Sequence, residues 1–280
     1  MLPGKLYVVG TPIGNLSDIS KRALETLSTV DFIAAEDTRV TVKLLNRFNI
    51  KKAMISYFEH NKKEKGMQIC QRILAGENCA LVTDAGMPCI SDPGEDLVRL
   101  CIEQNIETVS VPGPSALLAA LSISGQKAQR FAFEGFLSVN KKNRISHLNE
   151  LKYEKRTMIF YEAPHKLKNT LKDFFEFFGD RELSIVREIT KRYETVIRTT
   201  TKEATEMYDN ITLKGEIVLI LSGLREKCAE PLFTLAEAAE KAKNLILNEG
   251  LKTAEAARIA AEETGVKKNL IYKELLINDI

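Results

Sequence analysis

The chain of 280 residues is poor in the residues that form disulfide frameworks and metal clusters. It has three scattered histidines, and its five cysteines are odd in number and form no C-x-x-C pair. Reduced thiols in a cytoplasm are the simplest interpretation, and the sequence predicts no metal site. The cysteines are Cys70, Cys79, Cys89, Cys101 and Cys228.

Long apolar runs are also missing from the chain. No stretch approaches the roughly 18 residues that a membrane-spanning helix needs. The first ten residues lead straight into a strand pattern, without the charged leader, apolar segment and cleavage site of a secretory signal, so we expect none. With 44% hydrophobic and 28% charged residues, the composition indicates a folded globular protein rather than a disordered chain.

Three common catalytic or phosphate-binding motifs are absent. The spacing Gly10-x-x-x-Gly14 differs from the G-x-G-x-x-G of dinucleotide-binding folds, and the chain has no G-x-x-x-x-G-K-[ST] loop. It also has no G-x-S-x-G segment, which positions the nucleophile of many serine hydrolases. These absences argue against NAD-dependent redox chemistry, nucleoside triphosphate hydrolysis and serine hydrolysis.

Neither sign of charge dominates the chain as a whole. It has 40 basic and 38 acidic side chains, a net charge of +2. Basic residues exceed acidic ones in the middle of the chain, over residues 141–192. This surplus fits a polyanionic partner, but it equally fits a solvated face.

Strand and helix patterns alternate through the first 123 residues. This alternation predicts a mainly parallel sheet that helices cover on both faces. The expected strands are 6–9, 31–35, 53–58, 79–82 and 109–111, and the expected helices are 20–30, 42–48, 67–74, 97–102 and 115–123.

The pattern changes in the second half of the chain. Two neighbouring strands at 183–189 and 195–200 have little between them, which indicates an antiparallel pair inside a second α/β unit. The remaining expected strands are 131–137, 157–161 and 216–221, and the expected helices are 141–152, 165–178, 234–248, 253–264 and 268–277.

We therefore predict an α/β protein with two α/β domains and a small helical tail. The expected boundaries are 1–116, 117–225 and 230–280. Within the tail, Ala261, Gly265 and Ile271 have the spacing of a helix-turn-helix, and Gly250 and Gly265 stand where helices end. A nucleic-acid-binding role and a plain three-helix cap explain this tail equally well.

Glycine, proline and short polar residues gather after four strands of the first sheet. Ligands of open parallel sheets bind beyond the carboxyl ends of the strands. Glycine and proline leave main-chain groups open to a ligand, and the small residues after Ser115 leave room for a flat base, which suits an adenosine cofactor. A plain helix start with a nearby proline explains the last loop as well. The loops are 10–15, 36–39, 84–94 and 112–116.

Seven segments of the chain carry a family resemblance. They read GTPIGNLSDIS, RALETL, DFIAAEDTR, VTDAGMPCISDPG, VPGPSA, FEGFL and KGEIVLIL. In this order and spacing they resemble the tetrapyrrole-methylase superfamily, and more narrowly its branch that methylates the small-subunit ribosomal RNA. The match runs from about Lys5 to Gly223 and continues into the helical tail.

This resemblance implies a methyltransferase, usually a homodimer, with S-adenosyl-L-methionine folded in a cleft between two α/β domains. It implies methylation of a cytidine ribose 2′-hydroxyl in 16S ribosomal RNA, either free or in the small subunit. Tetrapyrrole-making relatives carry an acidic residue where Met87 stands, and this difference favours the RNA branch. By motif, the residues expected to line the cofactor are Asp84, Gly86, Met87, Pro88, Ser115 and Ala116.

Transfer to a ribose hydroxyl needs a group that accepts its proton. Glu36, Asp37 and Asp92 are the candidate carboxylates, because they lie at predicted strand ends. Arg39 either keeps one of them ionised and contacts substrate, or forms a local ion pair with Asp37.

RNA binding needs basic groups and flat faces. Lysines beside Tyr57, Phe58 and His60 supply both, and a second basic stretch follows FEGFL. Asn15 could hold ribose or phosphate, although an asparagine after Gly14 is equally natural in a turn. The candidate substrate contacts are Asn15, Arg39, Lys62, Lys63, Lys141 and Lys142.

Two other functions remain open at this point. The same fold could methylate a tetrapyrrole or a protein, and the helices of 253–277 could belong to a non-catalytic regulator that binds nucleic acid. The second alternative leaves the four elaborate strand ends without a purpose.

Overall fold

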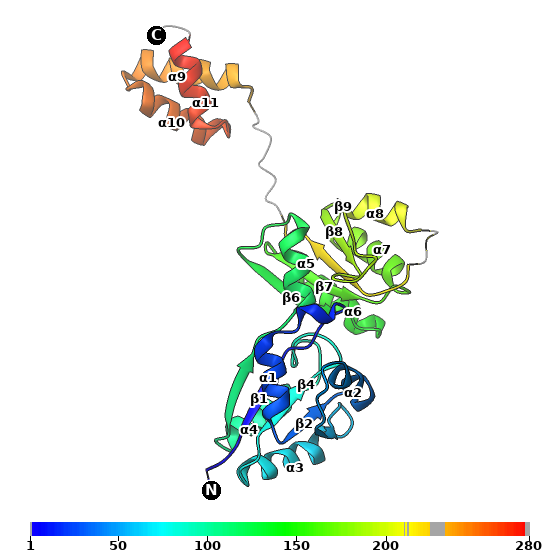
Figure 1. Ribbon diagram of the computed structural model, residues 1–280. Helices are drawn as coiled ribbons and strands as arrows, with labels where there is room; N and C mark the ends of the chain where they lie inside the picture. The colour runs from blue at the N-terminus through cyan, green and yellow to red at the C-terminus, as the bar shows by residue number, and fades with distance from the viewer. Residues whose placement is uncertain (1, 210, 212, 225–232, 278–280) are drawn as a thin grey trace. The chain divides into compact units, whose positions relative to one another are not determined.

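The computed structural model describes residues 2–209, 211, 213–224 and 233–277, and Cys228 lies outside them. The chain forms two compact units, Met1–Leu224 and Arg225–Ile280 (Figure 1). Among the described helices, none has the length and apolar character to cross a membrane.

The first sheet is fully parallel, as the alternating pattern predicted. Its strand order is β3-β2-β4-β1-β5. The central strands β2 and β4 are buried along their whole length, which explains their continuous apolar sequences. The strands are β1 (Lys5–Val9), β2 (Phe32–Ala35), β3 (Ala53–Ser56), β4 (Cys79–Val82) and β5 (Glu107–Val111).

Helices cover both faces of this sheet (Figure 1). Alternate strand residues point to opposite faces, so Phe32 packs with α3 and α4 while Ile33 packs with α1 and α2. We call this sheet and its helices the first lobe. The helices are α1 (Lys21–Thr29), α2 (Thr38–Arg47), α3 (Lys62–Leu74) and α4 (Glu95–Glu103), with a short 3₁₀ turn η1 (Leu16–Asp18) before them.

The second sheet is mixed, with the order β6-β7-β10-β8-β9. Strands β6 and β7 are parallel, whereas β10 runs antiparallel to both of its neighbours. The predicted antiparallel pair is confirmed as β8 and β9. The strands are β6 (Phe131–Phe136), β7 (Thr157–Glu162), β8 (Glu182–Arg187), β9 (Thr195–Thr200) and β10 (Ile217–Leu221).

Helices also cover both faces of the second sheet. On one face, α7 brings Phe174 against Phe160 of β7, with ring centroids 4.8 Å apart. On the other face, α5 packs Leu117, Ala120 and Leu121 against the sheet. We call this sheet and its helices the second lobe. The helices are α5 (Ala116–Ser124), α6 (Lys141–Glu150), α7 (Leu167–Phe178) and α8 (Thr201–Met207).

Helix α8 is an element that the sequence pattern did not predict. It begins directly after β9, where Thr200 caps it by accepting a hydrogen bond from the Glu203 amide. Only Thr201 and Ala204 of its seven residues are buried, which is too few to show a helical hydrophobic period.

The second unit is a bundle of three helices with its own core. Thr234 and Glu237 form a capping box at its start, and Gly250 and Gly265 end the first two helices in the left-handed conformation, as predicted. Alanines of the first two helices let them approach closely, and Ile271 packs against them. The helices are α9 (Leu235–Glu249), α10 (Thr253–Thr264) and α11 (Lys268–Ile277).

The core of the second lobe gives a stability prediction. Replacing the fully buried Phe160 with alanine removes its packing against Phe174, and we expect a loss of about 3–5 kcal/mol in the free energy of unfolding. The control, Phe175→Ala, changes a ring that is 41% exposed and should cost less than about 1 kcal/mol. Urea denaturation measures both, and equal losses would contradict this packing.

Candidate active site

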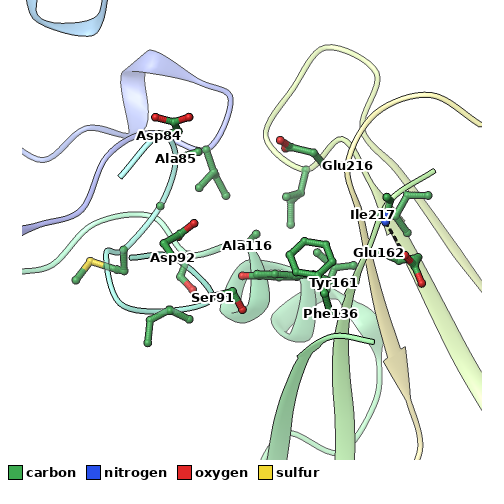
Figure 2. Close-up of a pocket in the computed structure, with 18 of the residues that line it drawn as sticks. Asp84, Ala85, Ser91, Asp92, Ala116, Phe136, Tyr161, Glu162, Glu216 and Ile217 are labelled. Atoms are coloured by element: carbon green, nitrogen blue, oxygen red, sulfur yellow. Dashed lines mark hydrogen bonds between the residues drawn. The ribbon is translucent and has the colours of Figure 1, made fainter. Parts of the chain in front are cut away.

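A cavity of about 610 Å³ opens between the two lobes of the first unit, a volume that suits a ligand of nucleoside size. Figure 2 shows the acidic loop after β4 on one side and Glu216 and Ile217 on the other. The lining comes from segments far apart in the sequence: Ile13, Glu36, Asp84, Ala85, Gly86, Met87, Ile90, Ser91, Asp92, Ser115, Ala116, Phe136, Tyr161, Glu162, Ala163, Pro164, Ile189, Gly215, Glu216, Ile217 and Val218.

Main-chain hydrogen bonds tie together the loops after β1 and β4. The Thr11 amide donates to the Gly86 carbonyl at 2.9 Å, and the Gly86 amide donates back to Thr11 at 3.1 Å. Gly86 has a φ of +91°, and a Cβ there would lie 3.4 Å from Ile13. Glycine is therefore the residue that lets this loop pass close to the cavity without strain.

The ends of β1 and β5 approach even more closely. A Cβ on Gly10 would lie 2.6 Å from the Cα of Gly113 and 2.6 Å from the sulfur of Met87. Both positions therefore require glycine, and the contact fixes the loop after β5, which leads to Ser115 and the start of α5.

The loop between β4 and α4 has an unusual backbone. Cys89 and Ser91 adopt φ values of +72° and +64°, although neither is glycine. Non-glycine residues in this region cost free energy and gather at functional sites. Here the conformation places both Ser91 and Asp92 in the lining of the cavity.

Three carboxyl groups from the first lobe line the cavity. The Thr83 hydroxyl donates a hydrogen bond of 2.5 Å to Glu36, and the Asp37 amide donates one of 3.2 Å to Asp84. Burial, and secondarily the charge of Glu36, raise the pKa of Asp92 to about 6. Burial and Glu36 also raise the pKa of Asp84. Among the described residues, no group of acidic, histidine or cysteine side chains is arranged to hold a metal ion.

The start of α5 provides main-chain donors at the cavity. Ser115 is the N-cap of this helix, but its side chain makes no capping hydrogen bond. One amide of the first turn, that of Leu117, donates instead to the Tyr161 hydroxyl at 3.2 Å. Ser115 and Ala116 line the cavity beside this turn.

The second lobe supplies the opposite wall. Because β7 and β10 are antiparallel, the end of β7 meets the start of β10, and Glu162 pairs with Ile217. The buried Glu162 carboxylate accepts hydrogen bonds from the Thr170 hydroxyl and from the Ala163 amide, the latter at 2.8 Å. These partners hold the chain in place where it turns out of β7.

Most of the predicted cofactor residues lie together in this cavity. Asp84, Gly86 and Met87 line it from the β4 loop, and Ser115 and Ala116 line it from α5. Pro88 belongs to the same loop but lies outside the lining. Two of the three predicted catalytic carboxylates, Glu36 and Asp92, also line it.

The third carboxylate, Asp37, lies outside the lining and is the N-cap of α2. It accepts hydrogen bonds from the Arg39 amide at 2.8 Å and from the Arg39 guanidinium at 2.6 Å. Hydrogen bonds from Arg39 lower the pKa of Asp37 to about 2. The structure thus forms the local ion pair that was one of the two alternatives for Arg39.

The predicted substrate contacts lie outside the cavity lining. Asn15 caps the 3₁₀ turn η1 by accepting from the Ser17 amide at 3.0 Å, and Lys62 forms ion pairs with Asp96 and Glu59. Lys141 and Lys142 are exposed in the first turn of α6, and Lys63 is exposed in the first turn of α3.

The flat surface expected beside Lys62 is smaller than predicted. Tyr57 is buried in the core of the first lobe, whereas Phe58 and His60 are exposed and contact each other edge to face. The alternation of the short strand β3 did not reveal this burial, because the residues that cover Tyr57 come from α3 and α4.

Sequence reasoning missed the wall that the second lobe contributes. Phe136, Tyr161 and Glu162 lie at the ends of β6 and β7, whereas Glu216 directly precedes β10, which runs antiparallel to β7. Two of the family-like segments, FEGFL and KGEIVLIL, contain Phe136 and Glu216 and were the available signal.

Comparison with protein families agrees with this architecture. Residues 5–205 match the family of tetrapyrrole (corrin/porphyrin) methylases, and the chain belongs to this family. Within it, the chain groups with proteins named ribosomal RNA small subunit methyltransferase I. The protein of that name from Synechocystis is 45% identical over 271 residues, covering 96% of both chains. The one from Thermotoga maritima is 48% identical over 220 residues, covering 79% of this chain and 99% of its own.

Solved structures with the same fold have much lower sequence identity. Cobalt precorrin-4 methyltransferase is 18% identical, with a TM-score of 0.58 over 78% of this chain and 94% of its own. The uroporphyrin-III C-methyltransferase of Thermus thermophilus in complex with S-adenosylhomocysteine is 15% identical, with a TM-score of 0.57 over 78% and 97%. These likenesses show the shared two-lobed fold.

The raised pKa of Asp92 predicts a stability change that depends on pH. In the unfolded chain Asp92 ionises near pH 3.8, but in the folded protein it keeps its proton until about pH 6. Ionised Asp92 therefore destabilises the folded state above pH 6, and Asp92→Asn should raise the free energy of unfolding at pH 8. The gain should shrink as the pH falls from 6 to 4 and disappear below about pH 3.8, where Asp92 is neutral in both the folded and the unfolded state.

The matched control is Asp37→Asn, for which the sign is reversed. The folded pKa of Asp37 lies below its unfolded value, so its ionised form stabilises the protein at pH 8, and this contribution is lost only between about pH 4 and pH 2. Thermal unfolding at pH 8, pH 4 and pH 2 measures both variants. A loss of stability in Asp92→Asn at pH 8 would refute the assignment of a raised pKa.

Proposed function

We propose that this protein transfers the methyl group of S-adenosylmethionine to the 2′-hydroxyl of a cytidine ribose in 16S ribosomal RNA. The observation that carries the proposal is a cavity of nucleoside size lined by ionisable carboxyl groups, in a chain 45% identical over 96% of its length to a protein named ribosomal RNA small subunit methyltransferase I. We place the activity in the cytoplasm, where ribosomal RNA is made in bacteria.

The lining of the cavity fits S-adenosylmethionine. Gly86 and Ala116 leave main-chain groups open and make room for a flat base, while Met87 provides apolar surface. Asp84 and Ser115 offer polar partners for hydroxyl and amino groups. Pro88 would shape the loop rather than touch the ligand. When bound, this cofactor supplies a methyl group on a positively charged sulfur.

Asp92 is our candidate for the group that receives the proton from the ribose hydroxyl. Its pKa of about 6 leaves it ionised at neutral pH yet more basic than an ordinary aspartate. Glu36 raises that pKa and is itself held by Thr83, so it acts as a positioning residue. We assign Asp37 a structural role, because its amide donates a hydrogen bond that holds the Asp84 carboxylate in place.

Contacts with the RNA backbone would lie outside the cavity. Lys141 and Lys142 are exposed beside the strand that ends at Phe136, and Lys63 and the exposed Arg39 flank the first lobe. Basic groups of this kind bind phosphate without reading sequence. We further propose that Asn15 contacts the RNA from its exposed turn and that Lys62 affects RNA binding only through its neighbours. We also propose that the protein is a homodimer.

We place the chemistry in the first unit and propose that its two lobes are separate domains, 1–116 and 117–225. The relative from Thermotoga maritima aligns over 99% of its own length with 220 residues of this chain, a length close to that of the first unit. This observation disfavours a non-catalytic regulator built around α9–α11. The helical tail, 230–280, would then assist binding rather than catalysis.

The direct test is a transfer assay with tritium in the methyl group of S-adenosylmethionine. The acceptors are small ribosomal subunits and free 16S ribosomal RNA from cells that lack the modification. We expect label in the RNA, at a nuclease-resistant cytidine linkage that marks a 2′-O-methyl group. Label in a porphyrin precursor, or none in RNA, would contradict the proposal.

The proposed role of Asp92 predicts a loss of turnover without a loss of cofactor affinity. Asp92→Asn should lower kcat by about 10²–10⁴-fold, and the kcat of the unmodified enzyme should fall as pH drops below about 6. Asp37→Asn, a neighbouring carboxylate outside the lining, should retain most of its turnover. If Asp92→Asn keeps full kcat in the transfer assay, Asp92 is not the acceptor.

The placement of the cofactor predicts a different outcome at Gly86. Valine at Gly86 introduces a Cβ at φ +91°, close to Ile13, and should weaken S-adenosylmethionine binding at least about tenfold in calorimetry. The control is Gly179→Val, because Gly179 also has a positive φ but has open space around it and lies outside the lining. Equal affinities of these two variants would remove Gly86 from the cofactor site.

A further inference from the structure

An aromatic ring lies open to solvent at the edge of the cavity. Phe136 lines the cavity, yet 56% of its surface is exposed (Figure 2). It is the last residue of β6, and the exposed Val139 follows in the turn that leads to α6. A large apolar side chain so placed has unfavourable contact with water unless a ligand covers it.

A bulge in β6 directs this ring toward the cavity. Phe133 pairs with Ile159, but the next pair is Gly135 with Phe160, so Glu134 is an extra residue. Without a bulge, strict alternation of the same residues would place Phe136 opposite Glu162 and turn it to the face covered by α7. With it, Phe136 pairs with Tyr161 on the face of the cavity. Bulges of this kind re-aim side chains next to active sites.

The bulge is fixed on both sides. The extra carboxylate, that of Glu134, contacts the Nε2 atom of His147 in α6 at 3.0 Å. Gly135 takes a φ of +63°, and a Cβ there would lie 3.3 Å from the Ser91 hydroxyl of the first lobe. The end of β6 is thus held against the loop that carries Asp92.

The ring of Phe136 is held in one orientation. It meets Tyr161 edge to face, with centroids 5.5 Å apart and an angle of 60° between the planes. Tyr161 in turn packs against Phe133 at 4.9 Å and accepts a hydrogen bond from Leu117. A ring that packs against such a fixed neighbour loses little conformational freedom when a second flat group stacks on it.

The nature of the covering group follows from the rest of the rim. Lys141 and Lys142 are exposed at the start of α6, a few residues beyond the ring, and they suit phosphate groups. A ribose that reaches Asp92 must belong to a nucleotide whose base is unstacked from its neighbours. Unstacked bases in RNA are recognised by stacking on aromatic side chains.

We propose that Phe136 is the stacking platform for the base of the nucleotide that accepts the methyl group. This inference rests on the proposed function and adds a specificity-determining residue to it. The platform holds the target base in an unpaired, splayed-out conformation, so the substrate class is a single-stranded or locally opened segment of RNA.

The experiment compares variants at position 136 in the transfer assay with small ribosomal subunits. Phe136→Leu keeps the apolar volume but removes the ring, and we expect kcat/KM for the subunit to fall about 5- to 150-fold, the range for loss of one base stack. Phe136→Tyr and Phe136→Trp keep a stacking face and should retain activity within about threefold of the unmodified enzyme. Calorimetric affinity for S-adenosylmethionine should be unchanged in all three.

Two features of the chain make the comparison clean. Phe175→Leu is the matched control, because Phe175 is also exposed but lies on α7 outside the lining. The chain contains no tryptophan, so the emission of the Phe136→Trp variant reports directly whether the ring is solvent-exposed and the fold intact.

Four outcomes decide the matter. A fall in kcat/KM for Phe136→Leu alone, with cofactor affinity preserved, supports the platform. Full activity of Phe136→Leu overturns it, and a parallel loss of cofactor affinity overturns it as well, because the ring would then serve the cofactor. An unmodified enzyme that labels no RNA would refute the proposed function itself, which separates that failure from a failure of the platform.

Discussion

The close main-chain approach at the carboxyl edge of the first sheet is the constraint on which the site depends. Gly10 lies against Gly113 with no room for a side chain, and Thr11 and Gly86 exchange two amide hydrogen bonds. These contacts fix three loops from separate strands relative to one another. A Cβ at either glycine of the first pair would push the loops apart and disperse the groups that meet at the cavity.

Bringing carboxyl groups together at the cavity lowers the stability of the folded protein. Neighbouring residues compensate for this loss. Asp92 is held where burial and Glu36 oppose its ionisation, in a loop with two non-glycine residues at positive φ. Such arrangements persist only when the surroundings hold them firmly. Here the support comes from the Thr83 hydroxyl beneath Glu36 and from the fully buried strand β4 that leads into the loop.

Much of this molecule could be predicted from sequence because its local and global signals agree. The apolar run 79–82 became the central strand β4, and Glu36 and Asp92 were found because the ends of parallel strands share one edge. The ion pairs of Lys62 with Asp96 and the burial of Tyr57 depend on residues distant in sequence, so spacing did not reveal them. The second wall was missed because mixed strand directions bring both strand ends and strand starts to the cavity.

The extra residue in β6 has an evolutionary consequence. Because the bulge decides which face of the sheet the end of β6 presents, mutations that remove the bulge without changing the length of the strand would exchange the side chain at the mouth of the cavity without touching the cofactor loops. Members of this fold are named for acceptors as different as uroporphyrin and ribosomal RNA. Gain or loss of a bulge in one edge strand offers a short mutational path between such acceptors, since it changes the side chain that contacts the substrate and leaves the methyl-donor site intact.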